Sequence, residues 1–135
     1  MVKFRMFGIH LEQFAILCEE SRSEIEMKVS LNFKYADKGR KIACVSVFNF
    51  LSGTEKVMVL ALTCDFEVQE DDWKKCRNGE KVVIPKNLLE FFAVHTIGTA
   101  RGVLFCKTES TKYNHIVIPP VNVSGMGLDD LVIEL

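Results

Sequence analysis

Residues 24–35, EIEMKVSLNFKY, alternate strictly between polar and apolar side chains. Every odd position in this stretch is apolar, from Ile25 to Tyr35, and every even position is polar. Side chains of a β-strand point to opposite faces with a period of two, whereas those of a helix repeat every 3.6 residues. The pattern therefore predicts a long strand in a sheet with one buried face and one face in water.

Further strands are predicted on both sides of this one. The polar segment 36–41 predicts a hairpin turn in which Gly39 adopts positive φ. Residues 42–51 are apolar on both faces, as in a central strand, and a second turn at 52–55 leads to a third strand over 57–69. Residues 4–11 predict a fourth strand. Short turns between consecutive strands favour an antiparallel meander.

The apolar spacing changes to that of a helix over residues 85–106. Gly98 and Gly102 each cost about 1 kcal/mol relative to alanine inside such a helix. Small residues let two helix backbones approach closely, so Gly98, Thr99 and Gly102 are predicted to form an interface with an identical subunit. The alternative is a glycine-bearing helix that kinks or frays in a monomer.

Composition restricts the class of protein. A chain of 135 residues with 48% hydrophobic and 26% charged residues is predicted to form one domain, residues 1–135. The net charge of −1 and the scattered basic residues argue against nucleic acid as a partner. Five cysteines without a CxxC spacing predict reduced thiols and a cytoplasmic location. No signal peptide and no membrane helix are expected, since no apolar span approaches 18 uncharged residues.

The sequence contains no motif typical of catalysis. None of His10, His95 and His115 has a second metal ligand at helical spacing, and no phosphate-binding or nucleophile-elbow motif occurs. We therefore expect a protein that is not an enzyme and needs no metal or cofactor. A small-ligand-binding or structural interaction domain is an alternative that uses the same sheet and helix.

The order of segments resembles the SecB family of protein-export chaperones. The resemblance is carried by the strands, the segment Phe66-Glu67-Val68-Gln69, the long helix with its Arg101-Gly102 pair, and the segment 118–123, IPPVNV. It implies an α+β, SecB-like fold, in which a four-stranded antiparallel sheet packs against one long helix. Pro119-Pro120 would redirect the chain into a short C-terminal helix starting near Gly127, with Asp129 and Asp130 in its first turn.

The resemblance also implies a function. SecB proteins are ATP-independent holdases that keep unfolded precursor proteins competent for export and deliver them to the SecA motor. They are homotetramers, arranged as dimers of dimers. A SecB-like protein specialised for a toxin–antitoxin pair is a variant of this interpretation.

Two sets of site residues follow from this interpretation. Asp65 and Glu67 are the candidates for contact with SecA, whereas Gln13 and Leu17 fill the two N-terminal positions that are acidic in the family. The candidate client-binding groove consists of apolar residues that could offer adaptable surface. These are Phe48, Phe50, Met58, Leu60, Phe66, Trp73, Met126, Leu128 and Leu131.

Overall fold

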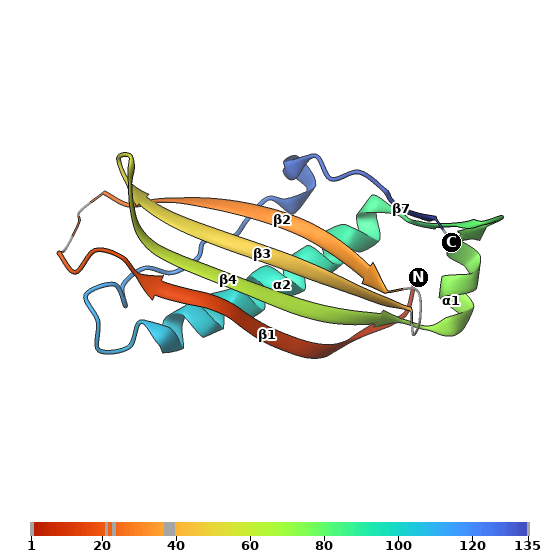
Figure 1. Cartoon of the computed structure of the whole chain (residues 1–135), viewed down its shortest axis with the longest axis horizontal. Helices are drawn as coiled ribbons and strands as arrows, with labels where there is room; N and C mark the ends of the chain where they lie inside the picture. The colour runs from red at the N-terminus through yellow and green to blue at the C-terminus, as the bar shows by residue number, and fades with distance from the viewer. Residues whose placement is uncertain (1, 21, 23, 37–39, 135) are drawn as a thin grey trace.

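The computed structural model contains one four-stranded antiparallel sheet with a long helix on one face (Figure 1). It describes residues 2–20, 22, 24–36 and 40–134. The strand order is β1-β4-β3-β2. The strands are β1 (Phe4–Ile16), β2 (Glu26–Ala36), β3 (Lys41–Ser52) and β4 (Glu55–Val68), and the helix is α2 (Lys86–Lys107). The predicted α+β class, the antiparallel sheet and the long helix are confirmed.

Strands β2, β3 and β4 form the predicted meander, and β1 completes the sheet from the other side. The turn between β3 and β4 contains Gly53, whose φ of 63° suits glycine. The predicted turn residue Gly39 lies outside the described residues. Strand β1 is longer than predicted, and the chain crosses over after it, so β1 pairs with β4 and not with β2.

Small side chains in the middle of the sheet allow α2 to pack closely on it. Cys44, Ser46 and Cys64 are fully buried on the face beneath the helix, and both cysteines lie next to Thr96 of α2. The Ser46 hydroxyl donates to the carbonyl oxygen of Leu62 at 2.8 Å, so this buried polar group is satisfied. The core therefore lies between α2 and the two central strands.

Helix α2 has the length and apolar composition of a membrane span, although no such helix was expected. Among the described residues it is the only helix that meets both criteria, and 44% of its apolar window is buried. The core helix of a soluble domain meets the same criteria, and α2 packs on the sheet in this way. The architecture is a small α+β fold of the soluble type.

The polar stretch after β4 forms a short helix followed by a hairpin. Helix α1 (Glu70–Cys76) leads into β5 (Arg77–Asn78) and β6 (Lys81–Ile84), with Gly79 at a φ of 66° between them. Trp73 anchors α1 in the core, since its side chain is only 7% exposed. Asp72 is buried beside it and accepts a hydrogen bond from the backbone nitrogen of Lys3 at 2.9 Å, so two residues fix this charged segment to the rest of the fold.

The predicted C-terminal helix is wrong. Residues after Pro120 form a 3-10 turn, η1 (Val123–Met126), and then the strand β7 (Leu131–Glu134), which pairs with β6. Asp130 does not start a helix of its own, because its Oδ1 accepts a hydrogen bond from the backbone nitrogen of Lys86 at 2.7 Å. It therefore satisfies a donor at the N-terminus of α2, where Pro85 offers no side-chain cap.

Candidate interaction surface

Six of the nine predicted client-binding side chains are part of the hydrophobic core. Each is at most 7% exposed. The ring of Phe66, for example, stacks on the ring of Phe92 of α2 with centroids 4.4 Å apart. The expectation that these residues line an open groove is therefore corrected, because the folded subunit buries them in its core. They are Phe48, Phe50, Met58, Leu60, Phe66 and Trp73.

The other three predicted client-binding residues are partly buried near the C-terminus. Met126 ends the 3-10 turn, and Leu128 follows it. Leu131 begins β7, and both leucines pack against the edge of the core. Their contact with a client stays a prediction.

An exposed apolar stripe runs along the side of α2 that faces away from the sheet. Phe91, Val94 and Phe105 are 48%, 54% and 51% exposed, and Gly98 and Gly102 lie between them at helical spacing. We call these five residues the helix stripe. A helix that only covers a sheet needs a single apolar face, so the stripe is surface beyond what the subunit core uses.

The two glycines of the helix stripe have no packing role within the subunit. A Cβ atom added at Gly102 would meet nothing within 4 Å, and one added at Gly98 would meet only the guanidinium of Arg101 at 3.9 Å. Thr99 is half-buried, and its hydroxyl donates to the carbonyl oxygen of His95 at 2.9 Å. The fold of one chain therefore gives no reason for glycine at either position.

A second exposed apolar row lies on β1. Ile9 pairs with Cys64 and Leu11 pairs with Leu62, and directly opposed residues of an antiparallel pair point to the same face. Because Cys64 and Leu62 are buried beneath α2, Ile9 and Leu11 point to the helix side of the sheet. They are nevertheless 54% and 41% exposed, since α2 does not cover this edge. We call these two residues the β1 row.

A small apolar cavity opens beside the helix stripe. It has a volume of about 290 Å³ and lies between the start of β1 and the start of α2. Its walls include Val2, Phe4, Leu88, Phe91 and His95. This volume is at the lower end of the range of small-molecule sites, roughly 300–1,000 Å³. The cavity can take an apolar side chain of another molecule.

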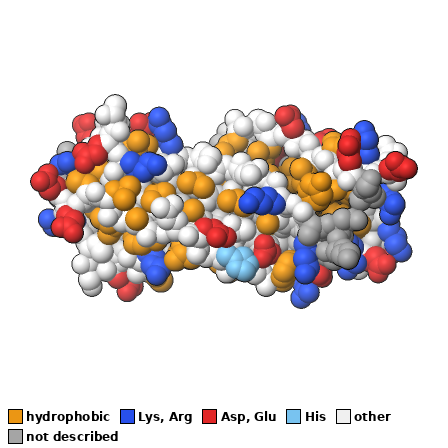
Figure 2. Space-filling view, viewed as in Figure 1, with side chains coloured by type: hydrophobic (Ala, Val, Ile, Leu, Met, Phe, Trp, Pro, Cys, Tyr) orange, Lys and Arg blue, Asp and Glu red, His pale blue; other side chains and the backbone are white. Residues whose placement is uncertain are grey.

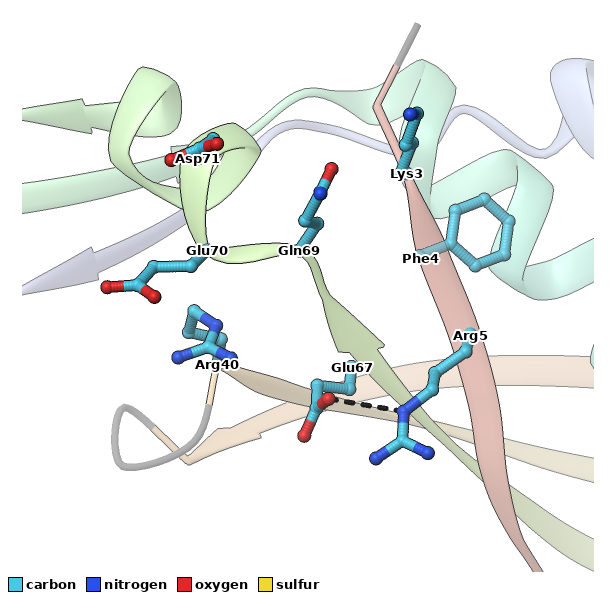
Figure 3. Close-up of a pocket in the computed structure, with 8 residues that line it drawn as sticks. All are labelled: Lys3, Phe4, Arg5, Arg40, Glu67, Gln69, Glu70 and Asp71. Carbon is cyan, nitrogen blue, oxygen red and sulfur yellow. Dashed lines mark hydrogen bonds and ion pairs between the residues drawn. The ribbon is translucent and has the colours of Figure 1, made fainter.

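The opposite face of the sheet carries the acidic candidates for SecA contact, and both are paired within the subunit. Asp65 Oδ2 lies 2.6 Å from His10 Nε2, and Glu67 Oε1 lies 3.2 Å from Arg5 Nε. Figure 3 shows the second pair at the edge of a cavity of about 530 Å³, in which Lys3, Arg5 and Arg40 are balanced by Glu67, Glu70 and Asp71. Each predicted acidic contact residue is thus already engaged by a side chain of its own subunit.

Figure 2 shows that apolar side chains on this outer side of the sheet are interspersed with polar and charged ones, and that charged side chains gather at both ends of the molecule. Val47 and Ala61 are directly opposed on the two central strands, as are Asn49 and Val59. Small apolar side chains thus line part of this face.

The cysteines and histidines do not form an evident reactive centre. Burial raises the pKa of the Cys44 thiol to about 11 and raises that of Cys64 in the same direction, which disfavours the nucleophilic thiolate. In the described part of the chain, no three His, Cys, Asp or Glu side chains cluster as a set of metal ligands. The prediction that the protein is not an enzyme stays a prediction.

Comparison with known proteins does not assign a family. No protein-family model matches the chain, and no curated protein matches it. The geometry of the exposed surfaces is therefore the evidence on which function is argued.

Proposed function

We propose that this chain is an ATP-independent holdase that binds unfolded proteins in the cytoplasm. The observation that carries the proposal is the apolar helix side, where the helix stripe and the β1 row expose large side chains although the core is complete without them. An exposed apolar patch that adjoins a finished core marks an interaction site. The resemblance of the sequence to the SecB family supports the same function.

In this proposal the helix stripe joins two subunits. Phe91 and Phe105 are equally distant in sequence from Gly98. If two copies of α2 cross antiparallel at Gly98, Phe91 of each copy therefore lies beside Phe105 of the other copy. Such a contact is self-complementary, as a two-fold interface requires. The cost of glycine in the helix is then offset by close contact between the two backbones. Pairing of such dimers would give the tetramer that the resemblance implies.

The β1 row and the cavity beside Phe91 then hold the client. Ile9 and Leu11 offer branched aliphatic surface along a strand, and the cavity accepts one larger apolar side chain. An extended unfolded segment presents apolar side chains without a fixed order, so shallow surface plus one pocket suits clients of varied sequence. Binding of this kind depends on area and needs no nucleotide.

SecA is not assigned as the recipient of the client. A basic partner that binds Asp65 and Glu67 competes with His10 and Arg5, whose side chains already contact the two carboxylates. The proposed holdase activity is compatible with Sec-dependent export, with a role in a toxin–antitoxin pair and with the holding of other unfolded proteins in the cytoplasm.

Suppression of client aggregation tests the proposal. A chemically unfolded client is diluted into buffer with the chain and without nucleotide, and light scattering is recorded. We expect suppression near stoichiometric amounts, and we expect the double substitution Ile9→Ser and Leu11→Ser to abolish it. The matched control is Ser30→Ala with Asn32→Ala, which changes two polar residues of the edge strand β2. Unchanged scattering with the wild-type chain would show an interaction domain without holdase activity.

A further inference from the structure

The structure places one exposed phenylalanine, Phe7, on the outer side of the sheet between two cations. The pairing of β1 with β4 shifts register between Met6 and Gly8, so Phe7 is left out of the ladder. Its ring lies 5.1 Å from Lys41 Nζ and 5.9 Å from Arg5 Cζ, and the side chain is 40% exposed. β-Bulges commonly re-aim one side chain at a functional site.

Gly8 allows this bulge to close around a charged pair. A Cβ atom at position 8 would lie 2.8 Å from Asp65 Oδ2 and 3.2 Å from His10 Nε2. A residue with a Cβ atom at this position would require the Asp65 carboxylate to shift. The glycine, the bulge and the contact between His10 and Asp65 are therefore one local arrangement, which presents Phe7 on the outer side of the sheet.

Among the described residues near Phe7, the three cations Arg5, Lys34 and Lys41 outnumber the two carboxylates Asp65 and Glu67. A cavity of about 330 Å³ adjoins the ring, and Lys34, Tyr35 and Lys41 line it together with Asp65. Asp65 is engaged by His10, and Glu67 is engaged by Arg5. Within the described residues, neither Lys34 nor Lys41 has a carboxylate within the 4.0 Å of an ion pair. Two lysines thus remain available at an aromatic wall.

We propose that this patch, formed by Phe7, Lys34 and Lys41, binds an acidic segment of a partner protein. Carboxylates of the segment pair with the two lysines, and an adjacent apolar side chain packs in the cavity against Phe7. The patch suits an acidic partner better than a basic one, because Asp65 and Glu67 are already engaged by His10 and Arg5. A nucleic acid fits less well, because its binding depends on several phosphate contacts and this patch offers two lysines.

The proposal goes beyond the holdase activity, because the patch lies on the other side of the sheet from the β1 row. Surface charge pairs of this kind mainly set the specificity and the association rate of a complex, and salt screens them. We therefore expect binding that weakens as ionic strength rises. An apolar contact alone would not weaken.

Fluorescence anisotropy with short labelled peptides tests the proposal on the full chain. One peptide alternates glutamate with leucine, and the matched peptide alternates lysine with leucine. We expect the glutamate peptide to bind and the double substitution Lys34→Glu and Lys41→Glu to weaken it about tenfold or more. Phe7→Ala should also weaken binding of the glutamate peptide. If Phe7→Ala does not fold, Lys41→Met tests the patch instead, because it removes one of the two lysine charges. Lys28→Glu, a charge reversal elsewhere on β2, should leave the affinity within about twofold.

Four results would overturn the proposal. The first is tighter binding of the lysine peptide than of the glutamate peptide. The second is a loss of affinity for Lys28→Glu as large as that for Lys41→Glu. The third is displacement of the glutamate peptide by a single-stranded oligonucleotide, which would make the patch a phosphate-binding surface. The fourth is loss of binding in the double variant Ile9→Ser and Leu11→Ser, which would place the peptide on the helix side of the sheet.

Discussion

The guanidinium of Arg101 binds the backbone at the proline pair, with Nε 2.6 Å from the carbonyl oxygen of Ile118. Its Nη2 donates in addition to the carbonyl oxygen of Pro119 at 3.1 Å. Pro119 and Pro120 have no backbone N–H, so the segment cannot join a strand ladder there. Arg101 satisfies the carbonyl groups instead and ties the extended segment to α2. The arginine and the two prolines, which are separate motifs in the sequence, form one contact in the fold.

Arg101→Ala should lower the free energy of unfolding by about 2 kcal/mol, because hydrogen bonds to a charged donor contribute roughly 1.5–3 kcal/mol. Arg101→Lys should recover only part of this, since lysine cannot donate from two fixed nitrogens. Urea unfolding followed by circular dichroism measures both. The control is Lys107→Ala, which removes an exposed cation of the same helix. An effect of Arg101→Ala no larger than that of the control would contradict this role of the arginine.

Tyr113 fixes the segment after α2 to the connection between β1 and β2. Its hydroxyl lies 2.6 Å from the carbonyl oxygen of Cys18 and 2.9 Å from that of Glu20, and the side chain is buried. Tyr113→Phe leaves these carbonyl groups without their donor, which should cost about 1–3 kcal/mol in thermal or urea unfolding. Tyr35→Phe removes an exposed hydroxyl and serves as the control. Equal stability of the two variants would show that water replaces the hydroxyl at Cys18.

The buried thiols predict a loss of stability at alkaline pH. The folded state raises the pKa of Cys44 from 9.0 to about 11, so it binds the thiol proton more tightly than the unfolded chain does. The stabilisation is complete below pH 9 and is lost as the pH rises toward 11, in total roughly 2–3 kcal/mol. Unfolding free energies measured across this range should fall less steeply for Cys44→Ala than for the wild type. Cys106→Ala, at an exposed thiol, should keep the wild-type slope. Parallel curves for wild type and Cys44→Ala would contradict the shift.

The elements with strong periodicity could be predicted from the sequence, and the exceptions have local causes. The alternation in β2 and the helical spacing of α2 each extend over enough residues to outweigh local propensity. Strand β7 could not be predicted, because four residues carry little periodicity and its partner β6 is distant in sequence. The pairing of β1 with β4 likewise depends on a crossover that no local pattern encodes.

The apolar surface could not be assigned to the right residues from the sequence. Phe48 and Ile9 are both large apolar residues in strands, and only the position of α2 decides that the first is buried and the second exposed. A bulge shifts Ile9 to the helix side, and a bulge is not visible in the alternation of β1. The glycines of α2 were the useful signal, since their cost to the helix pointed to the exposed stripe.

Gly98→Ala and Gly102→Ala distinguish an interface from an unpartnered helix. Both positions have room for a methyl group within the subunit, so alanine should stabilise an isolated monomer by about 1 kcal/mol at each site. If α2 crosses its copy at Gly98, the same methyl group separates the two helices and weakens self-association. We expect sedimentation equilibrium to show an assembly for the wild type and a shift toward monomer for Gly98→Ala. A wild-type monomer at all concentrations, stabilised by both alanines, would exclude the helix stripe as an interface.

Site-specific photocrosslinking tests the proposed holdase surface most directly. A photoreactive amino acid is placed at Leu11 in the β1 row, or at Asn32 on β2 as the control, and each chain is mixed with an unfolded client and no nucleotide. We predict strong crosslinks from position 11 and few from position 32. Client crosslinks absent from position 11, or equally strong at both positions, would contradict a client-binding surface on the helix side of the sheet.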